Sequence, residues 1–66
     1  MKSVEDMSDR DLLQRNIEEF SRLQNYMVLA EKGSDVYRAM KIRYIELKLI
    51  LTACGVYLTG LDIINE

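Results

Sequence analysis

The side chains able to do chemistry in this 66-residue sequence are carboxylates, tyrosines, lysines and one cysteine, because histidine is absent. Histidine is the usual general base near neutral pH, so any proton transfer would fall to other groups. The adjacent pairs Glu5–Asp6 and Glu18–Glu19 are the nearest approach to a catalytic carboxylate pair. Neighbouring residues on a helix diverge by about 100°, so neither pair converges on a substrate. We therefore expect solvated charges and no enzyme.

Cys54 and three isolated glycines argue against the common cofactor sites. One cysteine without histidine cannot supply the usual zinc ligands or form a disulfide within the chain. Gly33, Gly55 and Gly60 are isolated glycines, each explained as a helix stop or turn, so the sequence predicts no glycine-rich phosphate-binding loop. Cys54 continues an apolar pattern, so we expect a small buried packing residue; the alternative is a reactive or regulatory thiol. The sequence predicts no cofactor, no metal and no small-molecule substrate.

A basic ridge is a second candidate for function. Arg38, Lys41 and Lys48 share one side of a predicted helix, and Tyr37 and Tyr44 flank it. Basic side chains beside aromatic rings can bind a nucleic-acid backbone and stack on its bases. The net charge of −2 opposes this reading, because phosphate contacts dominate nucleic-acid affinity. The ridge remains an alternative, as a nucleic-acid-binding module or as a contact to an acidic partner.

Two helices must position these side chains. Apolar residues recur at spacings of three and four over 9–32 and again over 35–54, which is typical of amphipathic helices. Gly33 separates the two patterns as a helix stop, and Ser34 or Asp35 can cap the second helix. Such a short connection predicts an all-α, antiparallel helical hairpin.

The sequence after the second helix predicts a short return. Gly55 is a natural residue to end the helix, and Thr59 can cap a short third helix over 60–65. Residues 1–7 are expected to fray. The whole chain, 1–66, is short enough for one domain only. The fold class is therefore a single helical-hairpin domain with a short C-terminal helical turn.

The predicted second helix is apolar on two sides, and only one of them can face the first helix. One side is a seam with heptad spacing, consisting of Tyr37, Met40, Tyr44, Leu47, Leu51 and Cys54. The opposite side consists of Ile42, Ile45, Leu49 and Ala53. Burial of a large aliphatic side chain contributes about 1.5–3 kcal/mol, a large share of the stability of so short a chain. We therefore predict that a second copy covers the opposite side, forming a four-helix bundle.

Polar and charged residues bear on how the helices meet. Residues 1–31 carry seven acids and four bases, and residues 32–54 carry five bases and two acids, so the two segments have opposite net charge. Opposite charges favour the pairing of the two helices, within the chain or between copies. Asn16 and Gln24 interrupt the first apolar stripe. Either both reach solvent at its edge, or one is buried and fixes register or partner choice.

The function we expect is that of a small, non-catalytic interaction or regulatory protein. The uncharged stretch from Leu49 to Leu61 is shorter than the roughly 20 apolar residues of a membrane helix. Acidic residues near the start oppose an export signal, so we expect a cytoplasmic protein without membrane contact. In size and outline, the chain resembles the small helical hairpins with which bacteria and phages inhibit or bridge larger proteins. We therefore expect contacts with itself, as a homodimer, or with another protein, while the acidic first helix offers a further possible contact to a basic groove.

Overall fold

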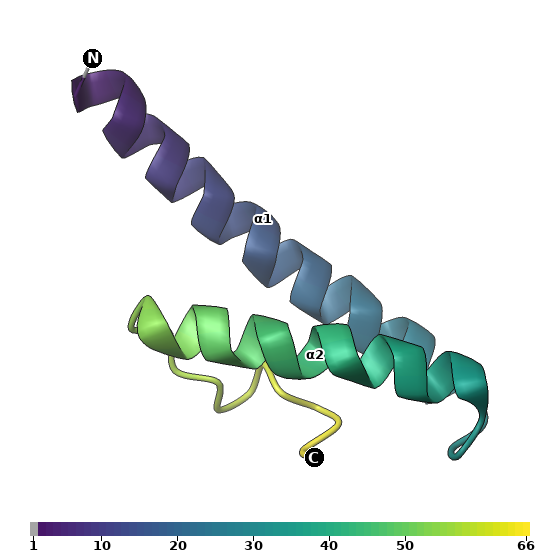
Figure 1. Ribbon diagram of the computed structural model, residues 1–66. Helices are drawn as coiled ribbons and strands as arrows, with labels where there is room; N and C mark the ends of the chain where they lie inside the picture. Colours follow the sequence, from purple (N-terminus) through teal and green to yellow (C-terminus); the bar gives the residue numbers. More distant parts are fainter. Residues whose placement is uncertain (1) are drawn as a thin grey trace.

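The computed structural model describes residues 2–66, with side chains from Arg10 onward. It contains two α-helices, α1 over Lys2–Leu29 and α2 over Asp35–Ala53, and no β-strand is present in this described part. The helices run in opposite directions and pack against each other, most closely near the loop that joins them (Figure 1). This arrangement confirms the predicted all-α helical hairpin.

The first helix differs from its predicted bounds at both ends. It begins at Lys2 instead of residue 9, so the backbone of residues 2–7 is helical where we expected fraying, and Met1 lies outside the described residues. It ends at Leu29, three residues before the predicted end. The amide of Ala30 still bonds to the carbonyls of the preceding turn, after which the chain enters the loop. Gly33 in this loop has a φ of 85°, which suits glycine.

The second helix begins at Asp35, as predicted, and ends at Ala53, one residue before the predicted end at 54. The Ser34 hydroxyl accepts a hydrogen bond from the Tyr37 amide at 3.1 Å, which satisfies one free donor of the first turn. At the other end, the Val56 amide bonds to the Leu51 carbonyl at 2.9 Å, and the Gly55 amide bonds to the Thr52 carbonyl at 3.0 Å. These two bonds form a Schellman motif, with Gly55 as its left-handed residue.

The predicted short helix over 60–65 is wrong. A single turn is present, in which the Asp62 amide bonds to the Leu58 carbonyl at 2.8 Å, and no helix follows it. A continuing helix would need the next backbone amides for its own ladder. Here the amides of Ile63 and Ile64 bond instead to the Gln24 side chain, and that of Asn65 bonds to the Asp62 carboxylate. Hydrogen bonds to the side chains of Gln24 and Asp62 therefore replace the helical hydrogen bonds.

Residues 56–66, which we call the returning segment, run back beside α2 and complete the core (Figure 1). The Phe20 and Tyr44 rings stack at the centre of this core, with centroids 5.6 Å apart and planes inclined by 10°. The other buried apolar side chains are Met27, Tyr37, Leu47 and Leu51. The returning segment adds four partly buried side chains to them, Val56, Leu58, Leu61 and Ile64. The segment after α2 therefore packs back on the hairpin, which agrees with the predicted short return.

Gly55→Val should lower the free energy of unfolding by about 1–2 kcal/mol. The φ of Gly55 is 84°, and a side chain in this left-handed region is strained, most of all when it is β-branched. No atom lies within 4 Å of the position that a Cβ would take, so the cost is conformational and not a clash. Urea denaturation measures it, with Gly55→Asn as the control, because asparagine tolerates this region better. Equal stability of Gly55→Val and the wild type would contradict the left-handed conformation.

Neither helix of the described chain combines the length and the apolar character needed to cross a lipid bilayer.

Candidate protein-interaction surface

The predicted interface residues lie together on the side of α2 that faces away from the core. Ile42, Ile45 and Leu49 remain 64%, 44% and 68% exposed, and Ala53 is exposed one turn further on. At about 100° per residue, the four Cα positions fall within an arc of about 80°. We call these four residues the outer face of α2. Large aliphatic side chains so exposed and so close together are typical of a surface that another element covers.

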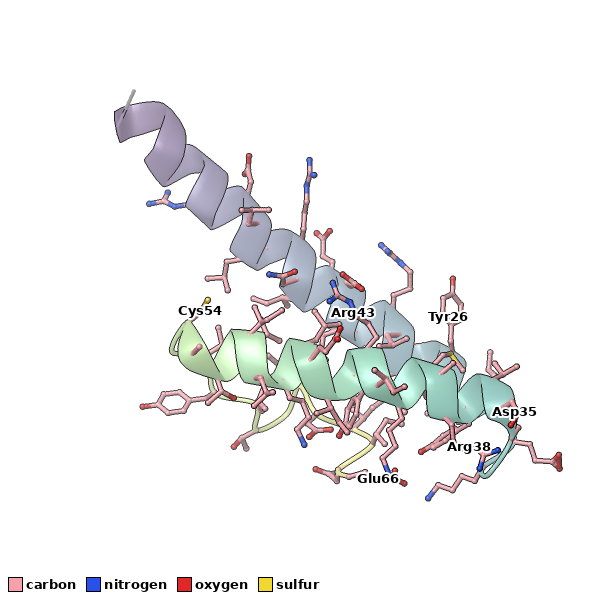
Figure 2. The ribbon with its side chains drawn as sticks, viewed as in Figure 1. Tyr26, Asp35, Arg38, Arg43, Cys54 and Glu66 are labelled. Carbon is pink, nitrogen blue, oxygen red and sulfur yellow. The ribbon has the colours of Figure 1, made fainter. Side chains whose placement is uncertain are left out.

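Charged residues next to the outer face are paired within the chain. Arg38 lies one turn before Ile42 and forms an ion pair with Asp35 at the start of α2 (Figure 2). Glu46 bonds to the Arg43 guanidinium at 3.2 Å. These exposed pairs contribute little to stability. They do reduce the net charge beside the outer face, which favours contact with another apolar surface.

The predicted basic ridge is occupied by acids of the same chain. Lys41 pairs with a Glu66 carboxylate oxygen at 2.9 Å, and Lys48 pairs with Asp62 at 2.9 Å, while Arg38 pairs with Asp35. The structure therefore brings Lys41 and Lys48 together with the returning segment. Arg38 lies apart from them, toward the start of α2. Because each cation already has an anionic partner, the ridge is a poor candidate for binding phosphates.

One bidentate ion pair links the two helices. The Arg43 guanidinium donates to both carboxylate oxygens of Glu19, from Nε at 2.8 Å and from Nη2 at 3.1 Å, and it lies between the helices (Figure 2). The hydrogen bond from Arg43 lowers the pKa of Glu19 below its usual value. This fork geometry fixes the register of the two helices more than it stabilises them. The predicted attraction between the oppositely charged helices is thus present within the chain.

Gln24 is the fully buried polar side chain of the core, at 0% exposure. Its Nε2 donates to the Leu61 carbonyl at 2.8 Å, and its Oε1 accepts from the amides of Ile63 at 2.6 Å and Ile64 at 3.0 Å. The position at the solvent edge that we first considered is therefore wrong for Gln24. The burial given in the other alternative is confirmed, and three of the hydrogen-bond partners of Gln24 lie on the returning segment. Its role in register or partner choice stays a prediction. Asn16, in contrast, is half-buried.

Tyr44 connects α2 to the returning segment. Its hydroxyl donates to Asp62 at 2.6 Å and accepts from the Glu66 amide at 3.0 Å and from Lys48 at 3.4 Å. Burial alone would raise the pKa of Asp62. The hydrogen bonds from Tyr44, from the Asn65 amide and from Lys48 outweigh that effect, so the pKa of Asp62 is lowered. The hydrogen bond to Asp62 raises the pKa of Lys48.

Two cations and a tyrosine surround the Glu66 carboxylate. Lys41 and Lys32 approach it to 2.9 Å and 3.3 Å, and the Tyr37 hydroxyl donates to it at 3.1 Å. The hydrogen bonds from the two lysines lower the pKa of Glu66, and the bond to Glu66 raises the pKa of Lys41. Burial, followed by the hydrogen bond to Glu66, raises the pKa of Tyr37. Asp62 and Glu66 are therefore both held as anions beside α2, and Figure 2 shows Glu66 in this position.

The prediction that Cys54 is buried is wrong. Its side chain is exposed at the end of α2, beside the part of α1 that diverges from α2 (Figures 1 and 2). Because the helices diverge, the heptad seam loses its cover in its last turn. An open groove of about 460 Å³ lies there, lined by Leu12, Leu13, Asn16 and Cys54. The thiol is thus accessible. Among the other residues that line the groove, only Asn16 has a polar side chain.

No three cysteine or carboxylate side chains of the described residues gather closely enough to hold a metal ion. Comparisons of the chain with protein-family models, with curated proteins and with solved structures find no match. The candidate interaction surface, the outer face of α2, is therefore identified from the geometry of this chain alone.

Acid should release the returning segment. Asp62 and Glu66 have pKa values below those of the unfolded chain, so their contribution to stability is present above about pH 4–5 and is lost as the pH falls through the lower, folded values. We expect the melting temperature to fall between pH 6 and pH 3. Asp62→Asn combined with Glu66→Gln should lower the melting temperature at pH 6 and flatten this dependence. An unchanged pH profile in that variant would contradict a role for the two carboxylates.

Proposed function

We propose that this protein is a non-catalytic interaction protein that self-associates through the outer face of α2 and acts through protein–protein contacts. The observation that carries the proposal is the exposure of Ile42, Ile45 and Leu49 in one stripe. Full burial of these three side chains would contribute about 1.5–3 kcal/mol each. That is substantial for a domain in which six apolar side chains of the described residues are buried in the core.

A second copy is the partner that fits this stripe with the fewest assumptions. α1 and the returning segment already cover the other sides of α2, so the chain has no further element of its own described residues to place on the outer face. A two-fold axis would set the stripe against itself and place the two α2 helices at the centre of a four-helix bundle. Charges beside the stripe are already paired, so no net charge of one sign opposes the approach of an identical copy.

Such a dimer would suit a regulatory role. It would display two copies of every remaining surface, including the exposed side of α1, and so could bridge two molecules of a larger protein or block one of its surfaces. Neither role needs catalysis. The regulatory role rests on the self-association, so the first experiment addresses self-association.

Leu49→Asp should convert the dimer into a monomer. A carboxylate buried in an apolar interface is costly unless it is paired, so the variant should dissociate at concentrations where the wild type is dimeric. Sedimentation velocity at micromolar concentrations measures the mass, and circular dichroism checks that the helices remain. A folded Leu49→Asp variant with the same sedimentation coefficient as the wild type would refute the interface.

Leu29→Asp is the matched control, because it makes the same substitution at a leucine that is 84% exposed at the end of α1. It should leave the mass unchanged. A mass reduced equally by both substitutions would show that an added charge, and not the outer face, governs association.

A further inference from the structure

The returning segment packs on a surface of polar and charged side chains from α1, the loop and α2. We propose that this surface binds, in trans, an extended segment of another protein that carries aliphatic side chains and two acids, and that the returning segment is its occupant within the chain. We call the surface the receiving surface. It consists of Gln24 on α1, Lys32 in the loop, and Tyr37, Lys41, Tyr44 and Lys48 on α2.

Gln24 recognises main-chain groups and not a particular side chain. In the returning segment, its amide group donates to the Leu61 carbonyl and accepts from the backbone amides of Ile63 and Ile64. Any extended or turning segment with the same backbone course could supply these partners. If the returning segment left, the side chain of Gln24 would lose three of its four hydrogen bonds, keeping a 3.4 Å bond to the Phe20 carbonyl. Water would take these places on the vacated surface, and a replacement segment that supplies the same three main-chain partners would displace it.

The side chains of the receiving surface add specificity. Tyr44 and Lys48 bind the Asp62 carboxylate, at 2.6 Å and 2.9 Å. Lys32, Lys41 and Tyr37 bind the Glu66 carboxylate. Three residues separate these two acids along the bound segment. The partly buried Leu61 and Ile64 lie on either side of the first acid. The expected ligand is therefore an aliphatic segment with acids at positions i and i+4.

Little regular structure holds the returning segment in place. It contains one hydrogen-bonded turn and no helix, so side-chain contacts with α1 and α2 supply most of its attachment. Its connection to α2 is direct, through Cys54 and Gly55, which gives it a local concentration on the order of millimolar. A ligand in trans must compete with that concentration. The segment therefore acts as a built-in competitor for the receiving surface.

The experiment uses the full chain and a fluorescent peptide with the sequence of residues 56–66. Leu61→Asp with Ile64→Asp in the chain should disable its own segment, because both side chains pack on the core. Fluorescence anisotropy should then show peptide binding to this variant, and binding to the wild type at least about tenfold weaker. Ile63→Asp is the matched control, since Ile63 is 53% exposed in the same segment, and it should behave as the wild type does.

A second peptide tests the charge reading. Reversal of both acids, Asp62→Lys and Glu66→Lys in the peptide, should weaken binding to the disabled chain by at least about tenfold, because hydrogen bonds to charged groups are lost. Equal binding of the two peptides would overturn the proposal. So would no binding to a disabled chain that keeps its helices.

If the disabled chain loses its helices altogether, circular dichroism reports this loss directly. Excess peptide should then restore the helical signal, and no recovery would overturn the proposal. This inference does not depend on self-association, because the receiving surface and the outer face lie on different sides of α2. A monomeric wild type that binds the peptide would refute the proposed dimer alone.

Discussion

Tyr44→Ala should lower the free energy of unfolding by about 3–5 kcal/mol, the largest loss that we expect from a single substitution. The side chain is fully buried, its ring stacks on Phe20, and its hydroxyl bonds to Asp62 and to the Glu66 amide. Removal of a buried aromatic ring leaves a cavity in the core. It also removes the hydrogen bonds of the hydroxyl to the Asp62 carboxylate and to the Glu66 amide. Thermal unfolding should show a melting temperature lowered by more than about 12 °C.

Tyr44→Phe separates the ring from the hydroxyl. Phenylalanine keeps the stacking and the volume, so only the hydrogen bonds of the hydroxyl, to the returning segment and to Lys48, are lost, at a cost of about 1–3 kcal/mol. If Tyr44→Phe were as stable as the wild type, the hydroxyl would not hold the segment. If Tyr44→Ala were as stable as Tyr44→Phe, the ring would lie outside the core.

Gln24→Leu should destabilise the protein by about 2–4 kcal/mol, although leucine is apolar and similar in size. The substitution leaves the Leu61 carbonyl and the amides of Ile63 and Ile64 without partners, and an unsatisfied buried group costs about 1–3 kcal/mol. Hydrogen exchange locates the effect. The Ile63 and Ile64 amides should exchange much faster than in the wild type, while amides in the middle of α2 remain protected.

Gln14→Leu is the matched control for Gln24→Leu. Gln14 is exposed on the same helix and bonds only to the Glu18 side chain, at 3.3 Å, among the described contacts. Its replacement should change the free energy of unfolding by no more than about 0.5 kcal/mol. A loss at Gln14 as large as that at Gln24 would attribute the effect to a changed α1 and not to the returning segment.

The parts of the fold governed by local chemistry could be predicted from the sequence. Ser34 caps α2 because a hydroxyl at this position can bond to the free amide three residues later. Gly55 ends α2 because it adopts a positive φ without strain. The apolar periodicity likewise identified both helices and the stripe of Ile42, Ile45 and Leu49. Each of these features depends on local spacing, because each residue of the pattern lies within about one helical turn of the next.

The course of the returning segment could not be predicted in this way. Its backbone amides bond to the Gln24 side chain, which lies 39 and 40 residues away in the sequence. Local patterns therefore predicted a helix over 60–65. In the folded chain, however, the distant Gln24 side chain bonds to two of the amides that such a helix needs. One signal was present. Gln24 lies between Phe20 and Met27 in the centre of an apolar stripe, where a polar residue must find a buried partner.

The angle between the helices is the other feature that could not be predicted from the sequence. The seam of α2 continues through Cys54, so periodicity alone predicted burial there. Because α1 diverges from α2 toward that end, the last turn of the seam is uncovered (Figure 1). The partners of Lys41 and Lys48 were missed for a related reason, since Glu66 and Asp62 reach them only when the chain reverses after Gly55.

Sedimentation equilibrium of the wild-type protein tests the central claim most directly, because that claim is that a second copy covers the outer face of α2. At tens of micromolar, the account predicts twice the mass of one chain, with dissociation on dilution and far weaker association in Leu49→Asp. A single-chain mass throughout that range, in a protein that remains folded, would contradict it.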